Sequence, residues 1–288
     1  MDDVVIGRNR RNVVLTGLPR SGTTLACHLL NKLPDTVALL EPIEPGRFAG
    51  LLPDREAVGD AMERWYRKAR RRALREGAVI TKHVGGEIPD NPFEASRDGK
   101  EPRQWLASKG RIGVGKDLER DFFLVVKDPP MFTALLPILA RRFPTFAIVR
   151  NPLAVLASWN SVDIPARQGR VPKAELYDPE LVRRLTAIEN RLGRQLGLLD
   201  WWCERFELYL PQEQIVRYED LVASGGRALA AIVPAAAGLD EALTGRNANE
   251  LYDRKDVAEI GERLLESDGA YWRFYPRESV EELLAQFA

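Results

Sequence analysis

The chain has 288 residues, 45% of them hydrophobic, and its 42 Lys and Arg residues balance its 42 Asp and Glu residues. A neutral chain of this length can bury a sizeable core, and its charge gives no reason to expect nucleic acid or a membrane surface as a partner. With Cys27 and Cys203 as the only cysteines, we expect no disulfide framework and a cytoplasmic location. The N-terminus is polar and no apolar run approaches about 20 residues, so neither a secretion signal nor a membrane span is expected.

Residues 13–30, VVLTGLPRSGTTLACHLL, predict a strand, a glycine-rich turn and a helix. Gly17 and Gly22 have the spacing of a phosphate-binding P-loop, in which backbone N–H groups and a helix N-terminus face an anion. The residue after the second glycine is Thr23, where an NTPase has a lysine that reaches the β- and γ-phosphates. The nearest cation is Arg20, inside the loop. The loop is therefore expected to bind phosphate, but not a magnesium-bound triphosphate.

Four further apolar runs indicate buried strands separated by helices, at residues 35–40, 122–126, 145–149 and 214–218. Strands that are apolar along their whole length are covered on both faces, as in parallel sheets. We therefore predict a three-layer α/β/α fold with about five parallel strands and the P-loop on the first of them. One domain is expected over residues 1–288. Its core would lie in residues 12–222 and its C-terminal part, 223–288, would be helical.

Two other helices and two loops complete the prediction. Helices are expected at residues 131–142 and, as one long helix broken near Gly193 or Gly197, at residues 180–210. Residues 77–115 and 163–179 are interpreted as loops that shape the substrate pocket, the first with one short helix around Trp105.

Residues 55–76 predict an amphipathic helix that carries a basic run from Arg67 to Arg75. Nucleic acid or an acidic substrate could bind such a run. Because the chain is neutral, we favour a solvated face close to Glu56, Asp60 and Glu63.

Polar side chains follow the predicted strands at their carboxyl ends. Glu41 follows the second strand, Lys127 the third and Arg150 the fourth, and Tyr218 ends the last. Ser158 lies eight residues after Arg150, in the helix expected to follow the fourth strand. In a parallel sheet these ends meet at one edge. A phosphate-binding loop, separate cations and no Asp-ended strand of the Walker B kind would suit an anion with two separate phosphates better than ATP with magnesium.

At these positions the chain resembles the sulfotransferases that use 3′-phosphoadenosine 5′-phosphosulfate (PAPS). Residues 17–24, GLPRSGTT, are similar to the family's 5′-phosphosulfate loop. Residues 147–152, AIVRNP, running on to Ser158, are similar to its 3′-phosphate motif. Residues 217–221, RYEDL, are similar to a segment whose tyrosine lies near the adenine. The resemblance covers residues 12–222 in element order.

The resemblance implies sulfuryl transfer from PAPS, as co-substrate, to a hydroxyl acceptor, without a metal. The donor would be held by residues of all three motifs: Ser21, Gly22, Thr23 and Thr24 at the 5′-phosphate, Arg150 and Ser158 at the 3′-phosphate, and Tyr218 at the adenine. Arg20 and Lys127 would polarise the leaving oxygen, and Glu41 would accept the proton of the acceptor.

Two departures select a branch of this family. The branch that acts on phenols and steroids has Lys at the position of Arg20, and a catalytic His two residues after the strand-end Lys, where this chain has Pro129. The chain is closer to the bacterial, carbohydrate and tyrosylprotein sulfotransferases, whose glutamate after the second strand corresponds to Glu41. Glu44 and His83 are alternative bases.

Two alternative functions remain at this stage. One is a P-loop kinase-like phosphotransferase, and the other is a non-catalytic nucleotide-binding protein on the same fold. The acceptor of a sulfotransferase could be a sugar, a lipid-linked sugar, a phenol or another small molecule, and the sequence does not indicate the oligomeric state.

Overall fold

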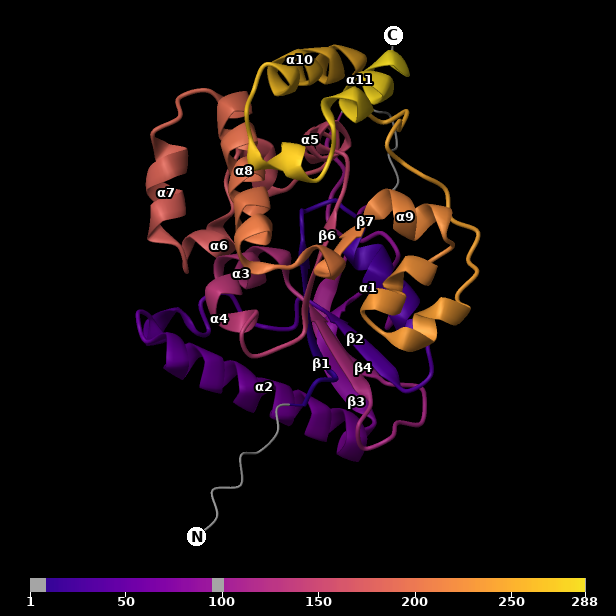
Figure 1. Cartoon of the computed structure of the whole chain (residues 1–288). Helices are drawn as coiled ribbons and strands as arrows, with labels where there is room; N and C mark the ends of the chain where they lie inside the picture. The colour runs from indigo at the N-terminus through magenta and orange to yellow at the C-terminus, as the bar shows by residue number, and fades with distance from the viewer. Residues whose placement is uncertain (1–8, 95–100, 288) are drawn as a thin grey trace.

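The computed structural model of the chain describes residues 9–94 and 101–287, and Figure 1 shows a twisted sheet between layers of helices. The central sheet has five strands in the order β2-β5-β1-β6-β7, and every neighbouring pair is parallel. These strands are β1 (Asn12–Gly17), β2 (Thr36–Leu40), β5 (Phe123–Lys127), β6 (Thr145–Val149) and β7 (Ile215–Arg217). The predicted α/β class and parallel sheet are confirmed.

Helices cover both faces of this sheet because alternate strand residues point to opposite sides. On one face Val14 and Val126 pack with Met62 and Tyr66 of α2. That layer contains α2 (Arg55–Glu76), α3 (Pro129–Ala134), α4 (Leu136–Leu139), α5 (Pro152–Asn160) and α8 (Arg191–Tyr209). On the other face Leu15 packs with residues of α1 (Thr23–Lys32), α9 (Tyr218–Ala223) and the 3-10 turns η4 (Arg227–Ala231) and η5 (Pro234–Gly238).

The prediction of a loop with a short helix around Trp105 is wrong. Residues 78–113 contain an antiparallel hairpin of β3 (Ala78–His83) and β4 (Ser108–Gly113), and Trp105 pairs as an isolated bridge with Phe93. The hairpin escaped the sequence reading because β4, SKGRIG, is polar and largely exposed, without the apolar alternation that marks a strand. Thr81 fixes the hairpin to the central sheet, since its Oγ1 accepts a hydrogen bond from Leu40 N at 2.8 Å.

The predicted long helix over residues 180–210 is two helices, α7 (Pro179–Thr186) and α8, and the break lies before both glycines. Asn190 begins α8, where its side chain accepts a hydrogen bond from Gly193 N at 2.6 Å. Gly193 and Gly197 lie inside α8, and a Cβ at either would come within 2.9 Å of Ile188. The two glycines therefore leave room for the side chain of Ile188 to pack against α8, and they do not break the helix.

Three further expectations need correction. The predicted helix over residues 131–142 is divided into α3 and α4, because Pro137 in the first turn of α4 has no N–H for a continuous helix. The segment expected to be irregular at residues 163–179 contains η2 (Pro165–Gln168) and α6 (Pro172–Glu175). The basic run of α2 is not solvated throughout, because Arg70 donates to Phe122 O at 2.7 Å, while Glu56 and Asp60 pair with Arg142.

The C-terminal part is mainly helical, as predicted, with α10 (Arg254–Leu265) and α11 (Arg277–Ala285) on top of the molecule in Figure 1. The shorter elements are η1 (Ala49–Leu51), η3 (Gln212–Gln214) and η6 (Ala270–Arg273). In the part of the chain that the structure describes, no helix is both long and apolar enough to cross a bilayer.

Candidate active site

A cavity of about 770 Å³ opens at the carboxyl edge of the central sheet. The parallel register brings the strand ends together there, since Lys127 lies beside both Leu40 and Leu15 in the neighbouring strands. Five residues predicted at or just after strand ends line this cavity, namely Arg20, Glu41, Lys127, Arg150 and Tyr218. The volume is in the upper part of the range of about 300–1,000 Å³ that is typical of ligand pockets.

The glycine-rich loop is closed by Ser21. Its Oγ lies 2.7 Å from the carbonyl oxygens of both Leu18 and Ile148, and its N–H donates to Leu18 at 3.1 Å. These bonds use both donors of Ser21 inside the loop, which differs from the expectation that its N–H would hold a phosphate. Ser21 is buried and shapes the loop; the cavity is lined by the residues that follow it.

Helix α1 directs its N-terminus into the cavity. Gly22 precedes the helix with φ of 90°, a conformation that favours glycine, and no side chain caps the first turn. A Cβ at Gly22 would lie 2.7 Å from Cδ2 of Tyr218, so the glycine also allows this ring to pack against the loop. Thr23 and Thr24 line the cavity at the start of the helix. Because the first N–H groups of a helix have no acceptor within it, this end is suited to an anion.

Arg20 crosses the cavity from the loop to α5 and to the segment before β4. Its Nε donates to Ser158 Oγ at 3.2 Å, both Nη atoms approach Asn91 Oδ1 at 3.4 Å, and the guanidinium lies 4.5 Å from the centre of the Phe93 ring. All of these partners are uncharged. Burial lowers the pKa of Arg20 to about 9, and the neighbouring cations Arg103 and Arg150 act in the same direction.

Arg150 is also buried among neutral acceptors. Its Nε donates to Asn247 Oδ1 at 2.8 Å, its Nη1 to Arg20 O at 2.8 Å and its Nη2 to Arg246 O at 2.5 Å, while the guanidinium lies 4.6 Å from the ring centre of Tyr218. The structure thus brings together Arg150 and Tyr218 as expected. The other half of the predicted 3′-phosphate motif, Ser158 Oγ, is bonded to Arg20.

Glu219, next to Tyr218, fixes the surroundings of Arg150. Its Oε1 accepts hydrogen bonds from Asn151 N at 3.1 Å and from Asn247 Nδ2 at 2.8 Å. Its Oε2 accepts one from the hydroxyl of Tyr275 at 2.5 Å. The carboxylate of Glu219 therefore connects the start of α5, the loop that contains Asn247 and the C-terminal part of the chain. It thereby holds Asn247 in place to accept the hydrogen bond from Arg150.

Two arginines of the cavity were missed by the sequence reading. Arg103 is 6% exposed, donates to Ser161 Oγ at 3.3 Å through Nη2, and has an Nε with no acceptor among the described residues. Arg246 lines the cavity from the loop that follows η5. Both lie in irregular segments without periodicity, so no local signal marked them.

We call Arg20, Arg103, Arg150 and Arg246 the arginine cluster. No carboxylate in residues 9–94 or 101–287 lies within ion-pair distance of any of these four guanidinium groups. Arg103 and Arg150 are buried, at 6% and 4% exposed, and burying cations without counter-ions is costly unless an anion accompanies them. The cluster is therefore suited to a multiply charged anion.

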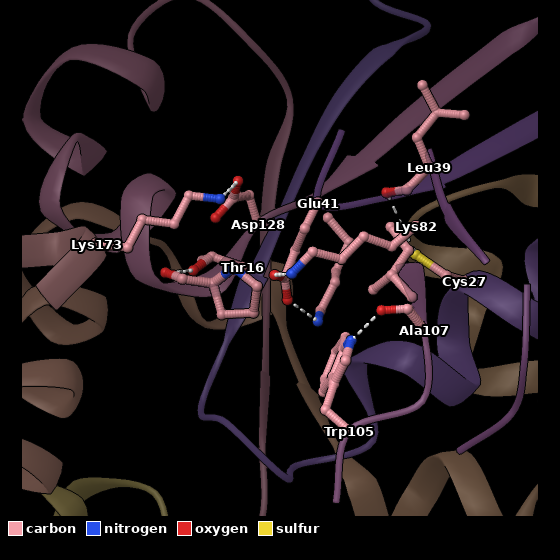
Figure 2. A network of polar contacts seen from close by, with 12 residues as sticks. Thr16, Cys27, Leu39, Glu41, Lys82, Trp105, Ala107, Asp128 and Lys173 are labelled. Carbon is pink, nitrogen blue, oxygen red and sulfur yellow. Dashed lines mark hydrogen bonds and ion pairs between the residues drawn. The ribbon is translucent and has the colours of Figure 1, made fainter. Parts of the chain in front are cut away.

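Glu41 lines the cavity and lies between two lysines, of which Figure 2 labels Lys82. Its Oε1 accepts a hydrogen bond from Lys127 Nζ at 2.9 Å and its Oε2 one from Lys82 Nζ at 2.6 Å. Burial alone would raise the pKa of Glu41, but the ammonium groups of Lys127 and Lys82 outweigh it and hold the pKa well below its usual range. Lys82 was not assigned from the sequence, because its position depends on the unpredicted hairpin.

The two alternative bases lie elsewhere. Glu44 is exposed and pairs with Lys109 Nζ at 2.5 Å, and His83 Nδ1 accepts a hydrogen bond from Gly86 N at 3.1 Å. Neither lines the cavity. Of the three candidates, Glu41 alone is placed to meet a ligand in it.

A second buried acid follows Lys127 directly. Asp128 is inaccessible to solvent and pairs through Oδ2 with Lys173 Nζ of α6, while its Oδ1 has no partner in the described part of the chain (Figure 2). Burial raises the pKa of Asp128 to about 6, although Lys173 opposes the shift. The pair ties α6 to the end of β5, and of the two residues only Lys173 lines the cavity.

Comparison with known proteins finds similarity in structure only. The chain matches the sulfotransferase STF9 from Mycobacterium avium with 15% identical residues over 97% of this chain and 76% of that one, at a TM-score of 0.35. It matches the sulfotransferase STF1 from Mycobacterium tuberculosis H37Rv with 16% identity over 96% and 76%, again at 0.35. The sequence matches no protein-family profile and no curated protein. Because the identity and the TM-score are this low, a functional assignment has to rest on the residues that line the cavity.

Proposed function

We propose that the protein is a sulfotransferase that moves the sulfuryl group of PAPS to a hydroxyl acceptor. The observation that carries the proposal is the arginine cluster without carboxylates, which lies beside a P-loop that lacks the NTPase lysine. Next to it, Glu41 offers a carboxylate in the same cavity. Binding of a polyanion and acceptance of a proton can therefore occur side by side.

The donor half of the cavity fits an anion with two separate phosphates. The N-terminus of α1 at Gly22–Thr24 would hold the 5′-phosphosulfate through backbone N–H groups and threonine hydroxyls. The guanidinium of Arg150 would exchange some of its neutral acceptors for the 3′-phosphate, with which arginine forms forked, charge-assisted bonds. Arg246 and Arg103 would add to this charge. Tyr218 would contact the adenine.

The transfer is an in-line displacement at sulfur. The acceptor oxygen forms a bond to the sulfur as the bond from sulfur to the bridging oxygen breaks, and that oxygen leaves on adenosine 3′,5′-bisphosphate. The acceptor's proton passes to a carboxylate oxygen of Glu41, a step worth about 10²–10⁴-fold in rate. Arg20 and Lys127, fixed before reaction, stabilise the charge that develops on the leaving oxygen.

The two lysines around Glu41 would affect its pKa differently before and after the donor binds. In the free protein they keep the carboxylate ionised, which is the form that can accept a proton. We expect the donor to share the ammonium charge of Lys127, which weakens its hold on Glu41. The pKa of Glu41 would then rise towards the range where a carboxylate is an effective base.

The kinase alternative has less support in the same cavity. Thr23 stands where the triphosphate-binding lysine is required, and the acid closest to the end of β5, Asp128, is engaged by Lys173 and does not line the cavity. A magnesium-bound triphosphate would therefore find neither partner in its usual place.

Calorimetric titration tests the donor assignment. The wild-type protein should bind adenosine 3′,5′-bisphosphate more tightly than adenosine 5′-monophosphate in magnesium-free buffer, by about 10–100-fold, since a charge-assisted contact contributes about 1.5–3 kcal/mol. Arg150→Ala should remove most of this difference. Arg246→Ala serves as a second variant, because the Arg246 side chain forms no hydrogen bond within residues 9–94 and 101–287, so its loss should not disturb the loop. Equal weakening of both nucleotides would contradict the 3′-phosphate assignment.

A further inference from the structure

We propose that the acceptor is an uncharged hydroxyl compound with an apolar body, a phenol or an aliphatic alcohol, and neither a sugar nor an acidic molecule. The inference rests on the proposed function and adds the chemical class of its second substrate. The acceptor's oxygen would bond to sulfur, its proton would go to Glu41, and its apolar body would occupy the half of the cavity that lies away from the arginine cluster.

That half of the cavity has apolar walls. They come from the loop after β2, the first turn of α3 and the residues in and around α6: Pro45, Pro130, Val171, Pro172 and Leu176. Trp202 of α8 lies behind them, and its indole nitrogen already donates to Thr133 Oγ1 at 3.1 Å. The prolines make these walls stiff, so the pocket is largely formed before a ligand enters.

The η2–α6 segment is fixed over the residues that follow Glu41. Lys173 Nζ approaches Ile43 O at 3.4 Å, and the hydroxyl of Tyr177 accepts a hydrogen bond from Phe48 N at 3.3 Å. A Cβ at Gly46 would lie 3.7 Å from Leu176 Cδ1, which shows how closely this side chain covers the loop. Yet Leu176 is 50% exposed. An apolar ligand beside Glu41 would remove part of this exposed surface from water.

The cations around this half already have acidic partners. Lys82 and Lys127 share Glu41, Lys173 pairs with Asp128, and Arg170 Nη2 lies 2.5 Å from Glu175 Oε2. Lys82 and Lys127 carry one positive charge more than the carboxylate that they share, but Glu41 engages both ammonium groups. An acidic acceptor would therefore have to compete with Glu41 for them, which is costly. This contrasts with the arginine cluster, whose members have no such partners.

A sugar would meet a related difficulty. Each of its hydroxyl groups needs a hydrogen-bond partner once it is removed from water, and an unsatisfied one costs about 1–3 kcal/mol. The walls formed by proline, valine and leucine side chains supply no such partners. Lys173 and Arg170 also line the cavity, but they already donate to Asp128 and Glu175. One hydroxyl directed at Glu41 is therefore what this half of the cavity accommodates best.

The test compares three acceptors with the purified full chain, PAPS and a measurement of adenosine 3′,5′-bisphosphate formation. We expect 2-naphthol to be sulfated with a kcat/KM at least about tenfold above that of 6-hydroxy-2-naphthoate, which differs by one carboxylate, and of D-glucose. Titration of 2-naphthol into the complex with adenosine 3′,5′-bisphosphate provides a second readout that does not depend on turnover.

Leu176→Ala and Leu208→Ala form a matched pair of variants. Both leucines are exposed, at 50% and 71%, but only Leu176 lines the cavity. Leu176→Ala should raise the KM for 2-naphthol by roughly 3–10-fold through lost apolar contact and leave the affinity for adenosine 3′,5′-bisphosphate unchanged. Leu208→Ala should change neither value.

The outcomes separate the two proposals. If adenosine 3′,5′-bisphosphate does not bind at all, the proposed function fails, and this inference fails with it. If the nucleotide binds but D-glucose or 6-hydroxy-2-naphthoate is the better acceptor, or 2-naphthol neither binds nor reacts, only the acceptor inference is overturned. An unchanged KM in Leu176→Ala would contradict the placement of the acceptor against α6.

Discussion

The two halves of the cavity manage positive charge in opposite ways. In the donor half, the arginine cluster has only neutral partners, such as Ser158, Asn91 and Asn247. In the acceptor half, Lys173 and Arg170 are each neutralised by a carboxylate of the chain. A protein with zero net charge thus keeps a strongly basic site in one place and an almost neutral one beside it.

The difference indicates which half awaits an ionic ligand. Cations that are buried without counter-ions destabilise the free protein, and the lowered pKa of Arg20, about 9, reflects this cost. An anion that binds to the arginine cluster would offset this cost. Lys173 and Arg170, in the other half, are already paired with carboxylates, so an anion there would stabilise them less. Glu41 lies at the boundary, between Lys82 and Lys127, where the proposed donor and acceptor would meet.

The largest effect is expected at that boundary. Glu41→Gln should lower the rate of sulfuryl transfer by about 10²–10⁴-fold, because the amide cannot accept the proton, while binding of adenosine 3′,5′-bisphosphate is retained. Glu44→Gln, at an exposed glutamate outside the cavity, is the control and should transfer at the wild-type rate. Transfer at the wild-type rate by Glu41→Gln would show that another group is the base.

A pair of arginine variants compares the two halves directly. Arg103→Gln should weaken binding of adenosine 3′,5′-bisphosphate by about 10–100-fold, since it removes a buried cation that has no acidic partner among the described residues. Arg170→Gln removes a cation that already pairs with Glu175, so the nucleotide affinity should stay within about twofold. Calorimetry on both variants measures the change in affinity for adenosine 3′,5′-bisphosphate. Equal changes in the two variants would contradict the difference between the two halves of the cavity.

A smaller effect is expected on stability, through Asp128. Its pKa is raised from the ordinary 3.8 to about 6. Between these values the folded protein holds a proton that the unfolded chain has released, so this residue makes the free energy of unfolding fall as the pH rises. Asp128→Asn should lack this slope, with a difference on the order of 1 kcal/mol between pH 4 and pH 7. Urea unfolding at several pH values measures it, and parallel curves for the two proteins would argue against the shift.

The sheet edge was predictable because parallel strands follow simple rules. Apolar runs located the five strands, and their carboxyl ends placed Arg20, Glu41, Lys127, Arg150 and Tyr218 in one cavity. What the sequence could not show is how each group is partnered. The hydroxyl of Ser21 closes the loop, and that of Ser158 meets Arg20 and not Arg150, because short side chains bind whichever carbonyl or donor the backbone brings near.

The rest of the site comes from segments whose structure depends on tertiary contacts. Lys82 reaches Glu41 because Thr81 joins the hairpin to β2, although its partner strand β4 has no strand-like pattern. The β-branched run from Val79 to Thr81 was a signal for this strand that could have been used. Arg103 and Arg246 lie in irregular segments, and no local pattern specifies where such residues lie in the fold.

The most direct test of the account is a double-label transfer assay. The purified protein is incubated with 2-naphthol and either PAPS labelled with ³⁵S in the presence of EDTA, or ATP labelled with ³²P at the γ-phosphate in the presence of magnesium. The account predicts transfer of ³⁵S to the acceptor, with one adenosine 3′,5′-bisphosphate released for each sulfate ester formed, and no transfer of ³²P. Transfer of ³²P with magnesium, and none of ³⁵S, would contradict it.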